Sequence, residues 1–450
     1  MPHWINKNPF YTKLNISEFD ENPLVAALNP IPPDEKEVMK KLFKFPTFRP
    51  EERELPWSSR ILLPARLENF FFPLGQHLNL LTSIYMHIVE GYRLDCRNPL
   101  SPEGQRTLHT AGGSINRPVI DNGSHRAASC LFICGLSGMG KSVSIRRALD
   151  FIGQPVIQHS VFNGRPFTEA QIVYLMRNVP EQASAKALCK TFGDYTDSLL
   201  GLDYYKQFFS DKSNTRQHYV SQLHRIVASH HVGAIVLDEV QNLSLAHSGG
   251  KEQLLALIQN LQEELAVPII LIGTPATLKM LETSMSLARR IVGLGFIEMD
   301  RPKNSKSPDW VTFCETVWEF QWVKEPVMLD SKIIRTLYNL SQGIYGIMIY
   351  LFVASQIHAI RSKHEVVDIK MLNSIYYDYF KPLHPALDAL KSQRYDQMMQ
   401  FDDFYHKGMK SIRKIDTLNM QTKQIQKIQK KLYNLNFCDK ENISNSKREP

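Results

Sequence analysis

The chain has 450 residues, of which 43% are hydrophobic and 22% charged, and its formal net charge is +8. The length predicts two or three domains, and the proportions are ordinary for a soluble globular protein that buries a full core. The chain opens on no signal-like segment, its apolar runs are far shorter than the ~20 residues of a membrane span, and its six cysteines include no C-x-x-C pair. We therefore expect neither secretion nor a membrane span, and neither a zinc site nor disulfides. We expect a cytoplasmic location.

The N-terminal part divides into two predicted regions. Residues 1–60 hold nine of the 25 prolines, a density that predicts an extended N-terminal extension without long helices. Residues 61–127 are predicted to be a helical region followed by a polar linker over 101–126. A helix is predicted from Pro73 to Glu90, with proline in its first turn and Gly91 at its end. Its apolar stripe is formed by Leu74, Leu78, Leu81, Tyr85 and Ile88.

Residues 131–142, LFICGLSGMGKS, carry the strongest motif. An apolar run with the length of a buried strand leads into G-x-x-x-x-G-K-[ST], and a predicted helix follows over Val143–Asp150. Glycines let consecutive backbone N–H groups surround a β-phosphate, Lys141 can reach the β- and γ-phosphates, and the Ser142 hydroxyl can ligate Mg²⁺. The motif therefore predicts binding of a nucleoside triphosphate with Mg²⁺. The predicted nucleotide-binding residues are Gly135, Leu136, Ser137, Gly138, Met139, Gly140, Lys141, Ser142 and Val143.

Short apolar strands alternate with helical segments on both sides of this loop. The further predicted strands are Pro155–His159, Gln171–Met176, Ala234–Leu237, Pro268–Ile272 and Leu294–Met299. Helices are predicted over 181–230, with a break at Ser213-Asn214, and over Leu254–Leu265, while Asn163-Gly164 predicts a tight turn. This alternation predicts an α/β fold over residues 128–301, with a parallel sheet flanked by helices.

Two acids end one of these strands. Asp238 and Glu239 follow the apolar run that starts at Ala234, and they lie 97 residues after Lys141. Asp238 is expected to hold Mg²⁺ together with Ser142, and Glu239 is expected to orient and deprotonate the attacking water. The pair of motifs predicts an ATPase.

Two further signals leave alternatives open. Thr274 ends the next strand, where its hydroxyl could position the water or could simply belong to a strand-end turn. Arg289 and Arg290 end a predicted helix. One of them could stabilise transition-state charge on the γ-phosphate of a neighbouring subunit, or the pair could close the helix at the surface through its dipole.

The C-terminal part is predicted to be a helical lid and a basic tail. The lid covers residues 302–385, with helices over Ser331–Leu340, Gly346–Ile360 and Ile369–Phe380. In the tail, 386–450, the last 45 residues hold eleven Lys or Arg against four Asp or Glu. This segment is either a solvated basic arm or one that meets an acidic partner, DNA or protein. Its apolar stripe also suits a helix that docks into a partner groove; the stripe is formed by Leu418, Ile425, Ile428, Leu432 and Leu435.

Together these features resemble an AAA+ P-loop NTPase with an α-helical lid domain, an N-terminal extension and a basic tail. The stretches around the nucleotide motifs resemble the TnsC/TniB family of AAA+ transposition regulators, in the TnsC-like branch of Tn7-like or CRISPR-associated transposons. The matching stretches are Pro73–His77, Gly91–Arg93, Arg97–Pro99, Gly135–Ser142, His159-Ser160, Asn163-Gly164, Gln171–Leu175, Ile235–Leu243 and Ile272–Ala276.

The resemblance implies ATP-dependent assembly of a homo-oligomeric ring or filament on double-stranded DNA. It also implies recruitment by a target selector of the TnsD or TniQ type, and activation of TnsA/TnsB-like transposase subunits, with the tail as the transposase-recruiting segment. The same resemblance assigns the roles above to Lys141, Ser142, Asp238, Glu239, Thr274 and one of Arg289 and Arg290. One departure concerns the lid. The stretch Ser341–Ile347 lacks the arginine that many AAA+ proteins carry in a Gly-x-x-Arg motif, so slow hydrolysis is expected.

A regulator that acts at many targets needs contacts to DNA phosphates rather than to base edges. The candidate DNA-binding residues are Arg165 and Thr168, near the predicted turn, and Lys186 and Lys190, after the third strand. Each of them also fits a solvated surface residue. Two other functions use the same core: a helicase or initiator loader, and an ATP-gated signalling scaffold that binds no DNA.

Overall fold

The structure, a computed structural model, describes residues 4–7, 9–93, 97–102, 104–105, 129–180, 184–211, 213–245, 267–275, 277 and 295–392. The predicted helix over Leu254–Leu265, the arginines Arg289 and Arg290, most of the linker and the tail from 393 onward lie outside the described residues. By their contacts the residues form two compact units. The sheet unit draws on Met1–Pro32, Leu80–Gly135 and Ser144–Glu298, and the helical unit on Pro33–Asn79, Leu136–Val143 and Met299–Pro450.

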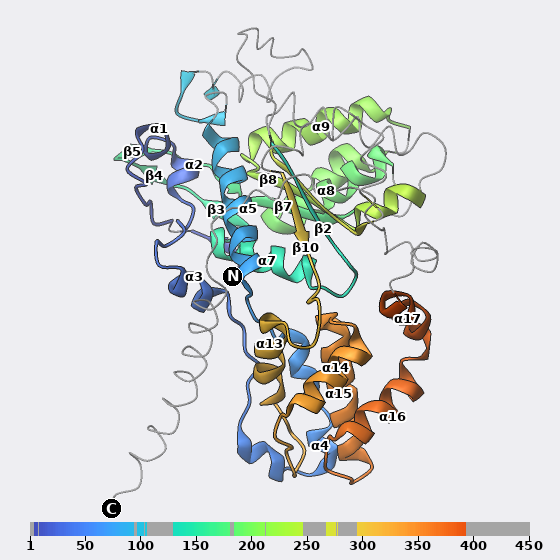
Figure 1. Cartoon of the computed structure of the whole chain (residues 1–450). Helices are drawn as coiled ribbons and strands as arrows, with labels where there is room; N and C mark the ends of the chain where they lie inside the picture. The colour runs from blue at the N-terminus through green and yellow to red at the C-terminus, as the bar shows by residue number, and fades with distance from the viewer. Residues whose placement is uncertain are drawn as a thin grey trace, which may run out of the picture. The chain divides into compact units, whose positions relative to one another are not determined.

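A five-stranded sheet forms the centre of the sheet unit (Figure 1). Its strands, in spatial order, are β10 (Phe296–Met299), β2 (Cys130–Gly135), β9 (Ile269–Gly273), β8 (Ala234–Asp238) and β7 (Tyr174–Asn178). The pairs β2–β9, β9–β8 and β8–β7 are parallel. Every residue of β2, β8 and β9 is buried, as expected for strands covered on both faces. The predicted parallel sheet is confirmed, as are its strands at 131–134, 234–237, 268–272 and 294–299.

Helices cover this sheet. On one face, alternate strand residues such as Phe132, Ile235 and Leu271 share a core with Leu188 of α8 (Ala185–Leu200) and Leu223 of α9 (Arg216–Ser229). A short π-helix over Tyr205–Phe209 lies between α8 and α9 in the chain. Residues 213–214 lie between this π-helix and the start of α9, so the predicted helical region with its interruption is confirmed. Helix α7 (Lys141–Ile152) follows β2, and α5 (Gly75–Arg93) lies on the opposite side of the strands from α8 and α9 (Figure 1).

Two of the predicted strands lie wholly or partly outside the five-stranded sheet, to which the alternating pattern assigned them. The segment at 155–159 contains β3 (Val156–Gln158), which belongs to a separate small sheet with β1 (Ile5–Asn6) and β6 (Ala170–Ile172). The predicted strand Gln171–Met176 is divided between β6 and β7, because the Val173 N–H turns to donate to the Pro155 carbonyl at 2.9 Å. Periodicity cannot show this division, since both halves are apolar.

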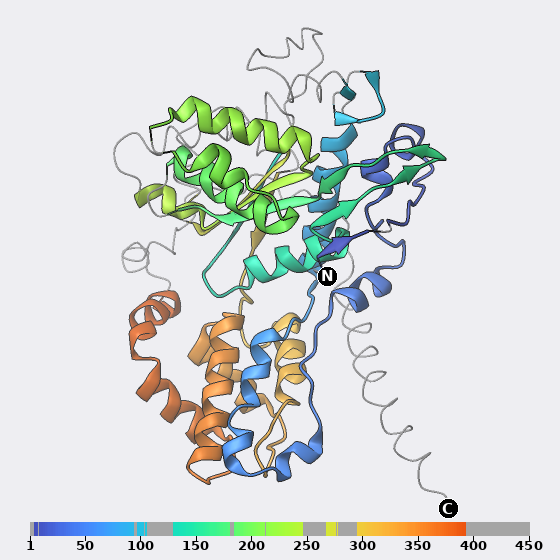
Figure 2. The ribbon, with the colours of Figure 1, turned by 180° about the vertical axis from the view of Figure 1, so that it is seen from behind.

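A hairpin with a two-stranded sheet of its own lies between β3 and β6 in the chain (Figure 2). Strands β4 (Val161–Phe162) and β5 (Arg165–Pro166) pair antiparallel across Asn163 and Gly164. Both turn residues have positive φ, 50° and 76°, as a type I′ turn requires. The predicted turn is confirmed.

The N-terminal residues form short elements rather than a purely extended chain. The longest is α3, with eight residues; the elements are α1 (Ser17–Asp20), α2 (Pro23–Ala26), α3 (Glu35–Leu42), η1 (Pro50–Glu54), α4 (Trp57–Arg60) and η2 (Pro64–Asn69). All residues from Leu24 to Leu28 are buried. The Asn22 side chain donates to the Tyr92 carbonyl at 2.8 Å, and the Gln171 side chain donates to the Leu24 carbonyl at 3.0 Å. This first segment is therefore part of the core of the sheet unit, and the absence of long helices agrees with its proline content.

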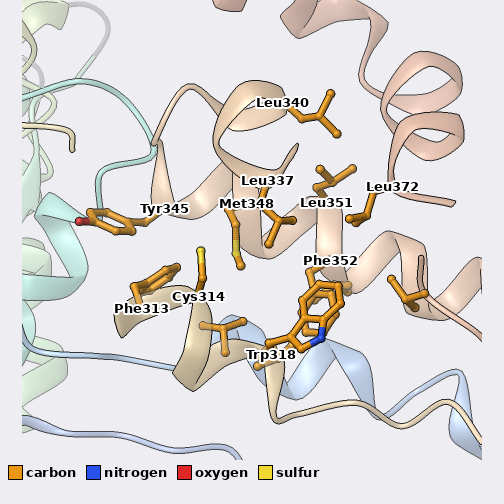
Figure 3. Packing of buried hydrophobic residues seen from close by; sticks show 14 of the residues in the cluster. Phe313, Cys314, Trp318, Leu337, Leu340, Tyr345, Met348, Leu351, Phe352 and Leu372 are labelled. Carbon is orange, nitrogen blue, oxygen red and sulfur yellow. The ribbon is translucent and has the colours of Figure 1, made fainter. Parts of the chain in front are cut away.

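The helical unit contains the three predicted lid helices, found as α14 (Ser331–Ser341), α15 (Tyr345–Arg361) and α16 (Ile369–Tyr379). Two helices were not predicted: α13 (Pro308–Trp318), whose first residue is proline, and α17 (His384–Ser392), which follows the short η6 (Lys381–Leu383). Figure 3 shows how side chains of α13 to α16 interdigitate in one core. Among the described residues no single helix combines the length and apolar content of a membrane span; α14 and α15 reach that threshold only as a pair bent by 114°.

Residues 33–79 complete this core rather than forming a unit with the rest of the N-terminal region. Phe48 packs edge-on against Trp322 with ring centroids 5.2 Å apart. The buried Arg60 guanidinium binds both carboxylate oxygens of Glu365, at 2.6 and 2.7 Å. Contacts therefore join segments that are far apart in sequence.

Candidate nucleotide-binding site

The predicted catalytic residues of the sheet unit lie at one edge of the sheet. The register pairs Cys134 of β2 with Gly273 of β9, and Asn178 of β7 with Asp238 of β8. Because these strands are parallel, their carboxyl ends share one edge, where ligands bind in open α/β sheets. The structure thus brings together Gly135, Asp238 and Thr274, each at or directly after the end of its strand.

The phosphate loop follows β2 and has the backbone of an anion-binding loop. Gly138 and Gly140 have φ of +80° and +84°, a conformation that glycine adopts without the cost of a Cβ. Lys141 begins α7, and its Nζ donates to the Leu136 carbonyl at 3.0 Å. A turn of this kind at a helix N-terminus directs N–H groups and partial positive charge at an anion, so the loop fits a phosphate group.

The side chains of the loop differ in exposure. Ser137 is exposed, as are the glycines on either side of Met139, and Ser142 is half-buried and accessible for an ion. Met139 is only 3% exposed and belongs to the core of the helical unit, against which Leu136 also packs. The loop therefore exposes the two glycines that flank Met139, whereas the side chains of Leu136 and Met139 pack against the core of the helical unit.

The end of β8 is held in an unusual turn. Glu239 has φ of +56°, which is uncommon for a non-glycine residue and occurs preferentially at functional sites. Its N–H donates to Oδ1 of the buried Asp238 at 2.8 Å. The Gln241 side-chain amide donates to Glu239 Oε2, and the Asn242 side chain donates to the Val179 carbonyl at 2.9 Å.

The sequence motifs did not single out the side-chain amides of Gln241 and Asn242. Gln241 and Asn242 come directly after the acidic pair, and polar residues at that position were the available signal. Their hydrogen bonds fix both the turn and the carboxylate of Glu239, the predicted base. Hydrogen bonds of this kind set the orientation that general base catalysis requires.

Thr274 follows β9 and has a buried hydroxyl. Its side chain is 2% exposed, and Oγ1 has no hydrogen-bond partner in the part of the chain that the structure describes. Buried polar groups are normally paired, because an unpaired one loses the hydrogen bonds of water. A hydroxyl of this kind at the binding edge of the sheet suits a water molecule or phosphate oxygen better than a plain strand-end turn.

A cation also lies at this edge. Arg177 precedes Asn178 at the end of β7, one strand away from Asp238, and its guanidinium stacks 3.5 Å from the ring centroid of Tyr195. Burial lowers the pKa of Arg177 and raises the pKa of Tyr195. No sequence pattern marks this residue, since it lies just beyond Met176, where the strand was predicted to stop.

The candidate DNA-binding residues occupy two kinds of environment. Arg165 and Thr168 are exposed, on and just after the β4–β5 hairpin. Lys186 and Lys190, on α8, both place their ammonium groups over the ring of Tyr219, at 4.7 and 5.4 Å from its centroid. Lys186 also donates to the Asn214 carbonyl at 2.9 Å. The two lysines therefore have cation–π partners within the sheet unit.

Comparison with known proteins adds the following. Residues 124–281 match the family described as an AAA domain. A comparison with curated proteins gives no match.

Among solved structures, the Walker-type ATPase PABY2304 of Pyrococcus abyssi is similar at 17% identity and a TM-score of 0.37, over 59% of this chain and 71% of that one. The ORC2 protein of Aeropyrum pernix, solved in ADPNP and ADP complexes, is similar at 12% identity and a TM-score of 0.39, over 56% and 62% of the two chains. Drosophila ORC bound to DNA is similar at 13% identity and a TM-score of 0.32, over 55% and 54%. Likeness this distant says nothing about function.

Proposed function

Because the chain contains an AAA domain with the α/β AAA+ fold, a domain that binds nucleotide and typically Mg²⁺, we propose that it is an ATPase that regulates DNA transposition. In this proposal it assembles on double-stranded DNA, links a target selector to the transposase, and activates insertion. The observation that carries the ATPase part is the shared carboxyl edge of β2, β9 and β8, from which the phosphate loop, Thr274 and the acidic pair all follow.

Each residue has a defined role at this site. The backbone of 135–143 and the Lys141 ammonium bind the phosphates of ATP, and Ser142 and Asp238 are the ligands for Mg²⁺. Bound Mg²⁺ neutralises charge on the phosphate oxygens. Glu239 accepts the proton of the attacking water, and the Thr274 hydroxyl orients that water. Arg289 or Arg290 of a neighbouring subunit is the proposed source of the trans-acting cation.

The transposition part is supported by the stretches that resemble the TnsC/TniB family. Two contacts in the sheet unit join these stretches in pairs. The His159 ring is hydrogen-bonded to the Gln171 side chain at 3.0 Å, and the Arg97 guanidinium stacks 4.9 Å from the ring centroid of Tyr92. Residues of these stretches therefore pack against one another in the fold.

The experiment is assembly of the purified full chain on random duplex DNA, with Mg²⁺ and a non-hydrolysable ATP analogue, observed by electron microscopy. Rings or filaments are expected that require nucleotide and weaken with salt, as phosphate contacts through Arg165, Thr168, Lys186 or Lys190 would dictate. The Lys141→Ala variant is the control and should not assemble. A wild-type protein that stays monomeric under these conditions would contradict the proposal.

Other outcomes point to the other functions. Assembly with ATP but no binding to DNA would indicate a signalling scaffold. DNA binding that depends on a replicative helicase would indicate a loader. Deletion of residues 406–450 should leave ATP and DNA binding intact and abolish capture of the transposase, since the apolar stripe of the basic tail is the proposed docking segment.

A further inference from the structure

The first turn of α15 touches the phosphate loop through backbone atoms, within the helical unit. The Gly346 N–H donates to the Gly138 carbonyl at 2.9 Å. The first N–H groups of an α-helix have no partner inside the helix, so they are available to an outside acceptor. Here that acceptor belongs to the loop that is expected to bind phosphate.

Both sides of this contact require glycine. A Cβ on Gly346 would lie 2.9 Å from the Gly138 oxygen and 3.4 Å from the Gly138 Cα. A Cβ on Gly138 would lie 2.8 Å from Cγ2 of Ile344. The atoms facing Gly346 are backbone atoms that cannot rotate away, so any side chain there must push the loop out of shape.

The turn that presents Gly346 is itself fixed. Gln342 and Gly343 have φ of 53° and 77°, and the Ile344 N–H donates to the Ser341 carbonyl at 3.0 Å. Arg301 donates to the Gln342 carbonyl at 2.7 Å. A turn held by these bonds can impose a geometry on the loop that it touches.

The loop is anchored to the same core by a side chain. Met139, between the two glycines with positive φ, is buried and belongs to the hydrophobic cluster of the helical unit. Other members of this cluster, among them Phe313, Tyr345 and Met348, are labelled in Figure 3. Removing Met139 from that core would expose apolar surface. The loop conformation and the position of α15 are therefore linked twice, through a hydrogen bond and through a buried side chain.

We propose that the turn 343–346 is a brace that shapes the phosphate loop, with Gly346 as a positioning residue. Gly346 closes the stretch Gly343-x-x-Gly346, which contains no arginine. Through this brace the helical unit is coupled to nucleotide by the backbone of the loop. This inference rests on the proposed nucleotide binding by the loop.

The experiment compares Gly346→Ala with Gly153→Ala, each in the full chain. A Cβ on Gly153 meets only ordinary contacts, at 3.7 and 3.9 Å, so this variant is the matched control. We expect the Kd for ATP with Mg²⁺ to rise at least about tenfold in Gly346→Ala, because a small displacement of a binding loop is costly. Gly153→Ala should stay within about twofold of wild type. Gly346→Arg, which restores the motif, should bind no better than Gly346→Ala.

Hydrogen exchange supplies a second measurement, which can be made on the wild type and does not depend on a folded Gly346→Ala. The Gly346 amide of the nucleotide-free wild type should exchange slowly, and Lys141→Ala should keep that protection while losing ATP. Rapid exchange at Gly346 would overturn the brace even if no variant could be purified. Wild-type affinity in a folded Gly346→Ala would also overturn it. A wild type that protects Gly346 but fails to bind ATP would instead overturn the proposed function.

Discussion

The sheet unit and the helical unit hold their residues together in different ways. In the sheet unit the central strands β2, β8 and β9 are apolar runs, and the polar residues Asp238 and Thr274 stand at the end of a strand or directly after it. In the helical unit, residues 33–79 are joined to the segment that begins at Met299 by aromatic contacts and by the buried pair of Arg60 and Glu365. Parallel strands therefore gather chemical groups at one edge, whereas packed helices mainly supply shape.

The largest effect should come from Glu239→Gln, at the edge of the sheet. This change keeps the size of the side chain but removes the base, so ATP hydrolysis should fall by about 10²–10⁴-fold while ATP binding is retained. Steady-state phosphate release and nucleotide titration measure the two quantities. Glu298→Gln, at a position on β10 outside the proposed site, is the control and should hydrolyse ATP normally. Equal loss in both variants would refute the role of Glu239.

Arg60→Met tests the helical unit. It leaves the Glu365 carboxylate, 15% exposed, without its bidentate partner, and breaking a buried pair costs about 3–5 kcal/mol. The matched control is Lys41→Met, which removes an exposed pair with Glu37 and should cost less than about 1 kcal/mol. Urea unfolding measures both. Similar midpoints for the two variants would show that the buried pair does not stabilise this unit.

Thr274→Val should separate function from stability. The Thr274 hydroxyl is buried without a partner among the described residues, so its loss should not lower the free energy of unfolding, yet it should slow hydrolysis about tenfold or more. Thr196→Val is the reverse case, because the Thr196 hydroxyl donates to the Phe192 carbonyl at 2.9 Å. That variant should lose about 1 kcal/mol and hydrolyse ATP normally. Unchanged hydrolysis in Thr274→Val would mean that Thr274 belongs only to a strand-end turn and does not position the water.

Lowering the pH should reduce the free energy of unfolding of both units in smaller increments. Burial lowers the pKa of His77, in the helical unit, to about 3, and burial also lowers the pKa of His159 and of His230, in the sheet unit, to about 4. Below a pH of about 6.5 the unfolded chain binds protons that the folded chain does not, so stability falls as pH drops, by up to about 1.4 kcal/mol per pH unit for each histidine.

The test of this step is urea unfolding at several pH values. His77→Asn cannot titrate, although it keeps an acceptor for the Leu74 N–H, which donates to the His77 ring at 2.7 Å. It should show a shallower loss of stability between about pH 6.5 and about pH 5 than wild type. An identical slope would mean that His77 is protonated in the folded protein.

Much of the sheet could be predicted because its signals are local. The runs ending at Cys134, Leu237 and Ile272 are apolar throughout, and the tight turn at Asn163-Gly164 follows from the φ preferences of two residues. The prediction failed at Val173, where one apolar run serves two sheets. The choice depends on a hydrogen bond to the distant Pro155, which no local pattern contains.

The same limit applies to the site. The phosphate loop, Asp238 and Glu239 were found from motifs, but the bond from Gln241 to Glu239 and the contact from Gly346 to Gly138 were not. The absence of an arginine in this part of the lid predicts slow hydrolysis, and the structure adds that Gly346 permits the close approach of two backbones.

Local sequence patterns were enough to locate the phosphate-loop motif, the acidic pair that ends a buried strand, the central strands and three lid helices. That residues 33–79 complete the helical core and that α15 touches the phosphate loop could be seen only in the folded chain. The reason is physical. Backbone preference and periodicity act over a few residues, whereas packing and hydrogen bonding between segments hundreds of residues apart depend on shapes that exist only after the chain has folded.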